Sequence, residues 1–63
     1  MPNLTLYVVE GFAAERKAAL LRRMTDAVVD SLGATPESVR IFLVELARAH
    51  VCVGGVTLAE TDQ

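Results

Sequence analysis

The chain has 63 residues, a formal net charge of −2 and a hydrophobic content of 52%. This length predicts a single domain, residues 1–63, because one domain ordinarily takes about 100–200 residues. Nucleic acid is excluded as the main partner, since 6 basic residues face 8 acidic ones and form no cationic surface. Disorder is excluded as well, because so apolar a chain has ample surface to bury.

A core built from so short a chain is small, and domains of this size usually add disulfides, a metal or partner subunits. Cys52 is the single cysteine and His50 the single histidine, so we expect neither an internal disulfide nor a structural zinc site. The sequence therefore predicts that self-association supplies the missing burial.

The expected location is the cytoplasm. No stretch reaches the roughly 18 consecutive apolar residues of a membrane helix, because Glu45, Arg48 and His50 interrupt the most hydrophobic region. No basic segment followed by an apolar one marks a signal peptide at the N-terminus. A lone thiol suits a reducing compartment. We expect no membrane partner.

Residues 3–9 alternate between two faces, with three aliphatic side chains on one of them, which predicts a β-strand. Residues 13–32 predict one amphipathic helix, because apolar positions recur at spacings of three and four while most charged side chains lie opposite. Gly33 follows the last periodic residue, where we expect a left-handed cap.

Residues 35–38 predict a short helical turn that Thr35 caps. Residues 39–46 predict a second strand, whose successive apolar residues indicate burial on both faces. Strand, helix and strand together form a βαβ unit with parallel strands. Two apolar runs around Gly54-Gly55 predict a hairpin, and the polar residues 59–63 are expected to fray.

Pro2 is the first candidate functional residue. Removal of Met1 would expose its secondary amine, and an α-amino group has a pKa of about 7.7–8.0. Burial and neighbouring cations lower such a pKa, so the amine can act as a general base near neutral pH. The structural alternative is that this proline simply begins a strand, where proline is tolerated.

Arg40 is the second candidate, because an arginine within an apolar strand is costly unless it is paired. It could pair with Glu45 or Glu37, or it could bind a substrate carboxylate through both guanidinium nitrogens. His50 and Cys52 fall on one face of a predicted strand, yet nothing else supports a Cys–His nucleophile pair. We interpret them as a partly exposed histidine and a small buried cysteine.

The order of these features resembles the 4-oxalocrotonate tautomerase family over essentially the full chain. The resemblance is carried by Met-Pro at the start, Glu10-Gly11, a single helix, Ser38-Val39-Arg40-Ile41, Glu45, His50 and Gly54-Gly55. It implies an α/β fold, a β-α-β tautomerase-like protomer whose C-terminal hairpin reaches onto a neighbour. It also implies a homohexamer, a trimer of dimers in which two protomers join their sheets.

The resemblance further implies an isomerase that needs no cofactor and no metal. Pro2 would be the catalytic base, taking the proton of a dienol hydroxyl and returning one to a distant carbon. Arg40, supplied by a neighbouring subunit, would bind the carboxylate and 2-oxo end and stabilise the developing enolate. The implied partner is a small enol or keto carboxylate.

Two positions depart from the family pattern. Phe12 stands where members acting on 2-hydroxymuconate carry an arginine for the far carboxylate, and Val51 stands where they carry an aromatic residue. Both changes predict altered specificity, with a more apolar site that suits a monocarboxylate of the arylenolpyruvate type. The alternative from another class is a non-catalytic tautomerase-like assembly, or one subunit of a hetero-oligomer.

Overall fold

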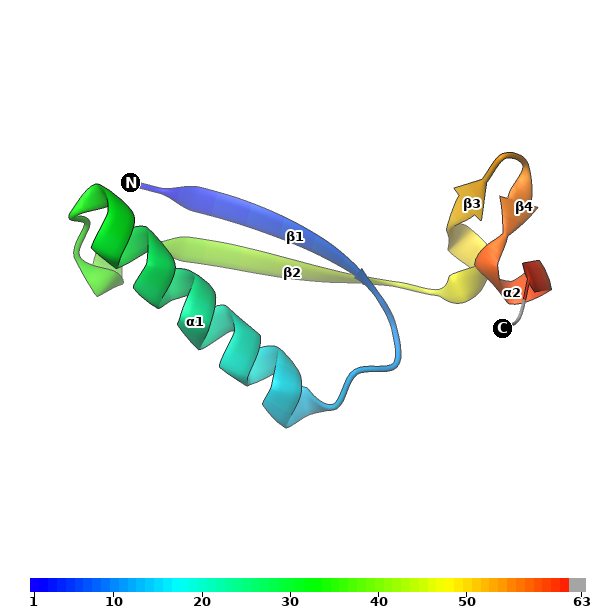
Figure 1. Cartoon of the computed structure of the whole chain (residues 1–63), viewed down its shortest axis with the longest axis horizontal. Coiled ribbons are helices and arrows are strands. Elements are labelled where there is room, and N and C mark those ends of the chain that lie inside the picture. The colour runs from blue at the N-terminus through cyan, green and yellow to red at the C-terminus, as the bar shows by residue number, and fades with distance from the viewer. Residues whose placement is uncertain (62–63) are drawn as a thin grey trace.

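Two parallel strands and one long helix form the body of the molecule. The computed structural model describes residues 1–61. Its first elements are β1 (Asn3–Val9), α1 (Ala14–Leu32), a 3-10 turn (Pro36–Ser38) and β2 (Arg40–Leu46). β1 and β2 pair in parallel along their full length, so the predicted βαβ unit is confirmed (Figure 1).

The ends of α1 and of the following turn show which local signals hold. Gly33 adopts the left-handed conformation with φ of 70°, and its N–H donates to the Val29 carbonyl at 2.9 Å, as predicted. The expected side-chain cap at Thr35 is wrong, because no such bond forms. Instead the Thr35 carbonyl accepts from both the N–H and the hydroxyl of Ser38, at 3.0 and 2.8 Å.

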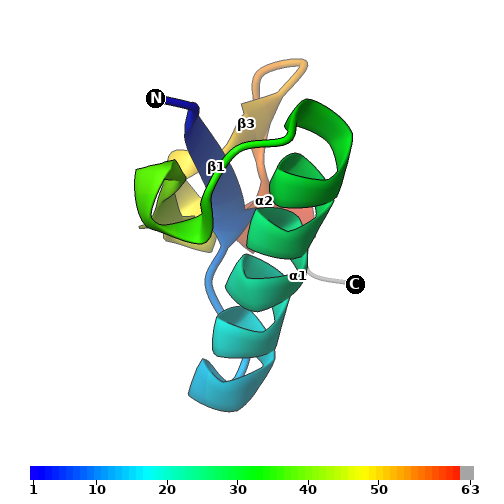
Figure 2. The same cartoon turned by 90° about the vertical axis from the view of Figure 1, so that its left-hand side faces the viewer.

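The sheet has one covered and one open face. α1 lies along one side of the two strands, over half-buried aliphatic residues such as Leu6 and Leu43 (Figure 2). On the opposite face Tyr7 and Phe42 are 65% and 55% exposed. The prediction that the second strand is buried on both faces is therefore wrong for a single chain, because the chain has one helix to cover two faces.

The C-terminal residues form a small separate unit. It contains a 3-10 turn (Arg48–His50), β3 (Cys52–Val53), β4 (Val56–Thr57) and α2 (Leu58–Thr61). β3 and β4 pair antiparallel around Gly54 and Gly55, which both have positive φ, so the predicted hairpin is confirmed. The predicted fraying is wrong for residues 59–61, which are helical; residues 62–63 lie outside the described part of the chain.

Reciprocal bonds between Thr57 and Glu60 explain why α2 forms. The Thr57 hydroxyl and N–H both donate to Glu60 Oε2, at 2.8 and 3.2 Å, and the Glu60 N–H donates back to Thr57 Oγ1 at 3.3 Å. This is a capping box, which satisfies free donors at a helix start. Hydrogen bonds from the Thr57 hydroxyl and then from its N–H lower the pKa of Glu60 below its usual value.

One chain does not close a core. The C-terminal unit stands at the end of an extended connection, far from the N-terminus (Figure 1). The radius of gyration is 14.8 Å, whereas a compact chain of this length has about 11 Å. No side chain among residues 1–61 is fully buried. Within the same residues, no helix has both the length and the apolar character needed to cross a membrane.

Candidate active site

Pro2 and Arg40 lie next to each other at the amino-terminal end of the sheet. The Arg40 N–H donates to the Pro2 carbonyl at 3.0 Å, which continues the ladder between β1 and β2. Pro2 is half-buried and Arg40 is exposed. Two of the four candidate residues are thus brought together by strand pairing, although they are 38 positions apart in the sequence.

Arg40 is not held by the carboxylate of Glu45, so that suggested pairing is wrong. Arg40 and Glu45 are five positions apart on β2, and residues an odd number apart on a strand point to opposite faces. Glu45 Oε2 instead accepts from Lys17 Nζ at 2.7 Å, across the covered face of the sheet. Among residues 1–61, no carboxylate forms an ion pair with Arg40.

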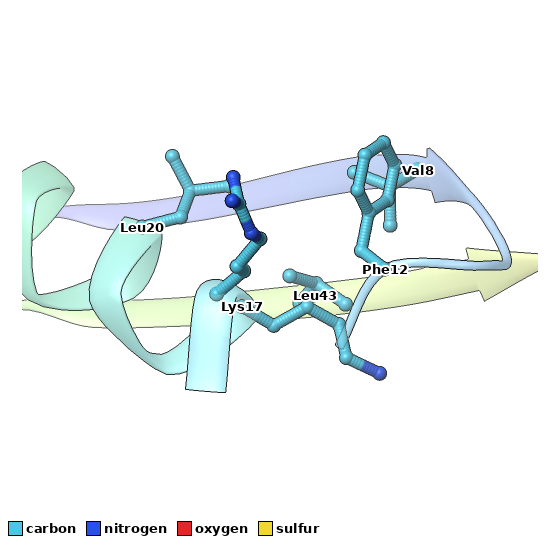
Figure 3. Close-up of a pocket in the computed structure, with 6 residues that line it drawn as sticks. Val8, Phe12, Lys17, Leu20 and Leu43 are labelled. Atoms are coloured by element: carbon cyan, nitrogen blue, oxygen red, sulfur yellow. The ribbon is translucent and has the colours of Figure 1, made fainter. Parts of the chain in front are cut away.

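Phe12 borders a hollow between the start of α1 and the covered face of the sheet. The hollow has a volume of about 140 Å³ and is lined by Val8, Phe12, Arg16, Lys17, Leu20 and Leu43 (Figure 3). Phe12 precedes the helix cap Ala13, and Lys17 is the fourth helical residue. A residue pair at these positions often packs together and fixes how the chain enters the helix. The Phe12 side chain remains 59% exposed and is therefore available to a ligand.

Val51 lies in the C-terminal unit, beyond the far end of β2. It is half-buried, and its carbonyl accepts the Leu58 N–H at 2.9 Å. Arg48 Nη2 donates to the Leu58 carbonyl at 2.9 Å, which further ties the unit together. Val51 is therefore positioned by the hairpin and α2, and not by the sheet that carries Pro2.

The interpretation of His50 and Cys52 is corrected in two respects. His50 closes a 3-10 turn and Cys52 begins β3, so the two do not share one strand face. Cys52 is also exposed, not buried, because the two-residue strand that carries it has no covering layer.

A single chain does not bring all four candidates together. Pro2 and Phe12 are at opposite ends of the seven-residue β1, about 20 Å apart at ~3.3 Å per residue. Val51 is further still, in a molecule 43 Å long. A site that combines Pro2 with Phe12 or Val51 therefore requires more than one copy of the chain.

Sequence reasoning missed Arg16, which lines the same hollow as Phe12. The available signal was its spacing of four from both Phe12 and Leu20, which places side chains on one side of a helix. The residue was overlooked because it lies among the charged residues at the start of α1. Within residues 1–61, His, Cys, Asp and Glu side chains do not gather in groups that could hold a metal ion.

The open sheet face, the projecting hairpin and the divided site define a small β-α-β protein with self-association surfaces. A family model described as Tautomerase enzyme matches residues 2–61. A 2-hydroxymuconate tautomerase from Pseudomonas sp. strain CF600 is 38% identical over 55 residues, which cover 87% of each chain.

Two solved structures agree with this match. A 4-oxalocrotonate tautomerase isozyme from Methylibium petroleiphilum has a TM-score of 0.91 and 35% identity, with 95% of this chain and 94% of that chain covered. A heterohexamer 4-oxalocrotonate tautomerase from Chloroflexus aurantiacus has a TM-score of 0.89 and 32% identity, with 95% and 97% covered. The chain belongs to the tautomerase family and is an isomerase of the 4-oxalocrotonate tautomerase type.

Proposed function

We propose that this tautomerase converts arylenolpyruvate-type or 2-hydroxydienoate monocarboxylates from the enol to the keto form, with Pro2 as the general base. Removal of Met1 frees the Pro2 amine. The amine takes the proton of the enol hydroxyl, and a proton is returned to carbon to give the 2-oxo acid. The observation that carries the proposed specificity is the exposed Phe12 ring at the edge of an apolar hollow.

Arg40 is proposed to bind the carboxylate and the 2-oxo group of the substrate. Its exposed guanidinium has no ion-pair partner among residues 1–61, so two donors are free for a planar carboxylate. The enolate gains negative charge as the hydroxyl proton leaves, and a fixed cation lowers the energy of that state. The proposed Arg40 comes from a neighbouring subunit.

The proposed assembly is a homohexamer in which sites form between copies. The open sheet face and the distance between Pro2 and Phe12 support a site shared by chains. The Chloroflexus relative is a heterohexamer, so a second type of subunit is the alternative for this chain. The non-catalytic alternative predicts an assembly with the same shape and no turnover.

A free Pro2 amine is the element of the proposal that one experiment tests most directly. Two samples are prepared, one with Met1 removed and one with an N-terminal extension, and intact mass verifies each terminus. We expect phenylenolpyruvate tautomerisation by the first sample alone, because the extension turns the amine into a non-basic amide. The rate should rise with pH as the amine loses its proton.

An Arg40→Ala variant of the processed sample provides the second arm. We expect it to lose more kcat/KM than Arg23→Ala, a change of an exposed arginine on α1. Equal activity of the processed and extended samples would exclude Pro2 as the base. Absence of turnover in both would favour the non-catalytic assembly.

A further inference from the structure

Arg16 is a charged group that the proposed reaction does not use. It lines the hollow beside Phe12, and among residues 1–61 no carboxylate forms an ion pair with it. The other cation of the hollow is Lys17, whose charge Glu45 offsets at 2.7 Å. The hollow therefore offers apolar walls and one uncompensated guanidinium.

The rest of the hollow limits what can approach that guanidinium. Its remaining lining is apolar: Val8, Leu20 and Leu43 with the Phe12 ring (Figure 3). Aromatic rings pack well against such side chains, in offset or edge-to-face contact with another ring. An anion, in contrast, gains from a guanidinium that presents two parallel donors. The hollow is complementary to an aromatic group that ends in a carboxylate.

We propose that Arg16 is a specificity-determining residue that binds an acidic group at the far end of an aromatic substrate. This inference rests on the proposed function, because it concerns the tail of the same enol. The substrate class is an arylenolpyruvate with a carboxylate at the para position of its ring. The reaction is unchanged: the enol O–H proton leaves, one proton reaches the adjacent carbon, and the ring carboxylate takes no part.

The position of Arg16 distinguishes this substrate from a short diacid. Arg16 is the third residue of α1 and is set back from Phe12 by about one helical turn, roughly 5 Å. A second carboxylate close to the dienol meets the Phe12 ring, which offers it no donor. A carboxylate carried beyond an aromatic ring extends past Phe12 to the guanidinium.

The test compares phenylenolpyruvate with its 4-carboxyphenyl analogue as substrates of the processed protein. We expect kcat/KM for the analogue to exceed that for phenylenolpyruvate by about tenfold, the size of one partly exposed charge-assisted contact. Arg16→Ala should abolish this preference and leave phenylenolpyruvate turnover unchanged. Arg23→Ala removes the same charge from an exposed site on α1 and should retain the preference. Higher salt should reduce the preference of the unmodified protein.

Binding of the two keto products separates failure of this inference from failure of the proposed function. NMR titration with 4-carboxyphenylpyruvate should shift the signals of residues 12–17 at lower concentration than phenylpyruvate does, and Arg16→Ala should remove the difference. That result without turnover would contradict the proposed function and support the Arg16 site. Equal turnover and equal binding of the two compounds, or a preference that survives Arg16→Ala, would overturn it.

Discussion

Phe12 determines which charge the entrance of the hollow offers to a substrate. Its ring is exposed at the point where the chain enters α1, and the cations Arg16 and Lys17 follow on the first helical turn. A substrate carboxylate next to Phe12 loses water without gaining a donor, which costs free energy. Residue 12 is therefore the position at which one substitution should change the preferred substrate.

Phe12→Arg should shift preference from phenylenolpyruvate toward 2-hydroxymuconate. A new charge-assisted hydrogen bond contributes about 1.5–3 kcal/mol, which corresponds to roughly 10- to 100-fold in the ratio of kcat/KM values. Phe12→Leu is the matched control, since it keeps the lining apolar and should keep the original order of substrates. Steady-state kinetics with both substrates measure the ratio. A processed, unmodified protein that already prefers the diacid would contradict the role given to Phe12.

At the scale of single elements, local signals predicted the body of the chain and failed where partners are distant. The strand, helix and strand follow from periodicity, which each segment carries in its own side chains. The capping box of α2 was missed, although Thr57 and Glu60 have the expected spacing, because the polar tail was treated as one segment. The Lys17–Glu45 pair joins residues 28 apart, and no local pattern identifies such a contact.

The capping box predicts how α2 responds to acid. The pKa of Glu60 is lowered by the Thr57 hydroxyl and then by its N–H, so the cap stabilises α2 above the ordinary glutamate pKa of about 4.3. This contribution should be lost as the pH falls through the lowered pKa. Thr57→Val removes the hydroxyl and should raise the pKa of Glu60, measured by NMR titration of its carboxyl carbon. The same pKa in both proteins would contradict this account of α2.

At the scale of the whole molecule, the single chain is an incomplete structure. It exposes 4782 Å², about a fifth more than a compact protein of 6.8 kDa. The excess includes the open sheet face with Tyr7 and Phe42 and the hairpin residue Val53, which is 70% exposed. The sequence predicted oligomerisation from composition, but which face stays open depends on where α1 packs. That information is tertiary, so the sequence pattern wrongly indicated two covered faces.

The open face leads to the last prediction, which concerns assembly. Burial of one large aromatic side chain contributes about 1.5–3 kcal/mol, and a hexamer would repeat that gain six times for Tyr7 and for Phe42. We expect a stable species of six times 6.8 kDa in sedimentation at micromolar concentration. Phe42→Lys places a charge on the open face and should give smaller species. Arg23→Glu changes charge at an exposed position of α1 and should leave the sedimentation coefficient unchanged.

Circular dichroism distinguishes dissociation from unfolding in the Phe42→Lys variant. Smaller species that unfold are also expected, because a chain with no fully buried side chain among residues 1–61 has little to hold it folded alone. In that case folding and assembly are one transition, and the thermal midpoint of the unmodified protein should rise with protein concentration. A well-folded, unmodified monomer whose midpoint is independent of concentration would show that the open face does not need a second copy.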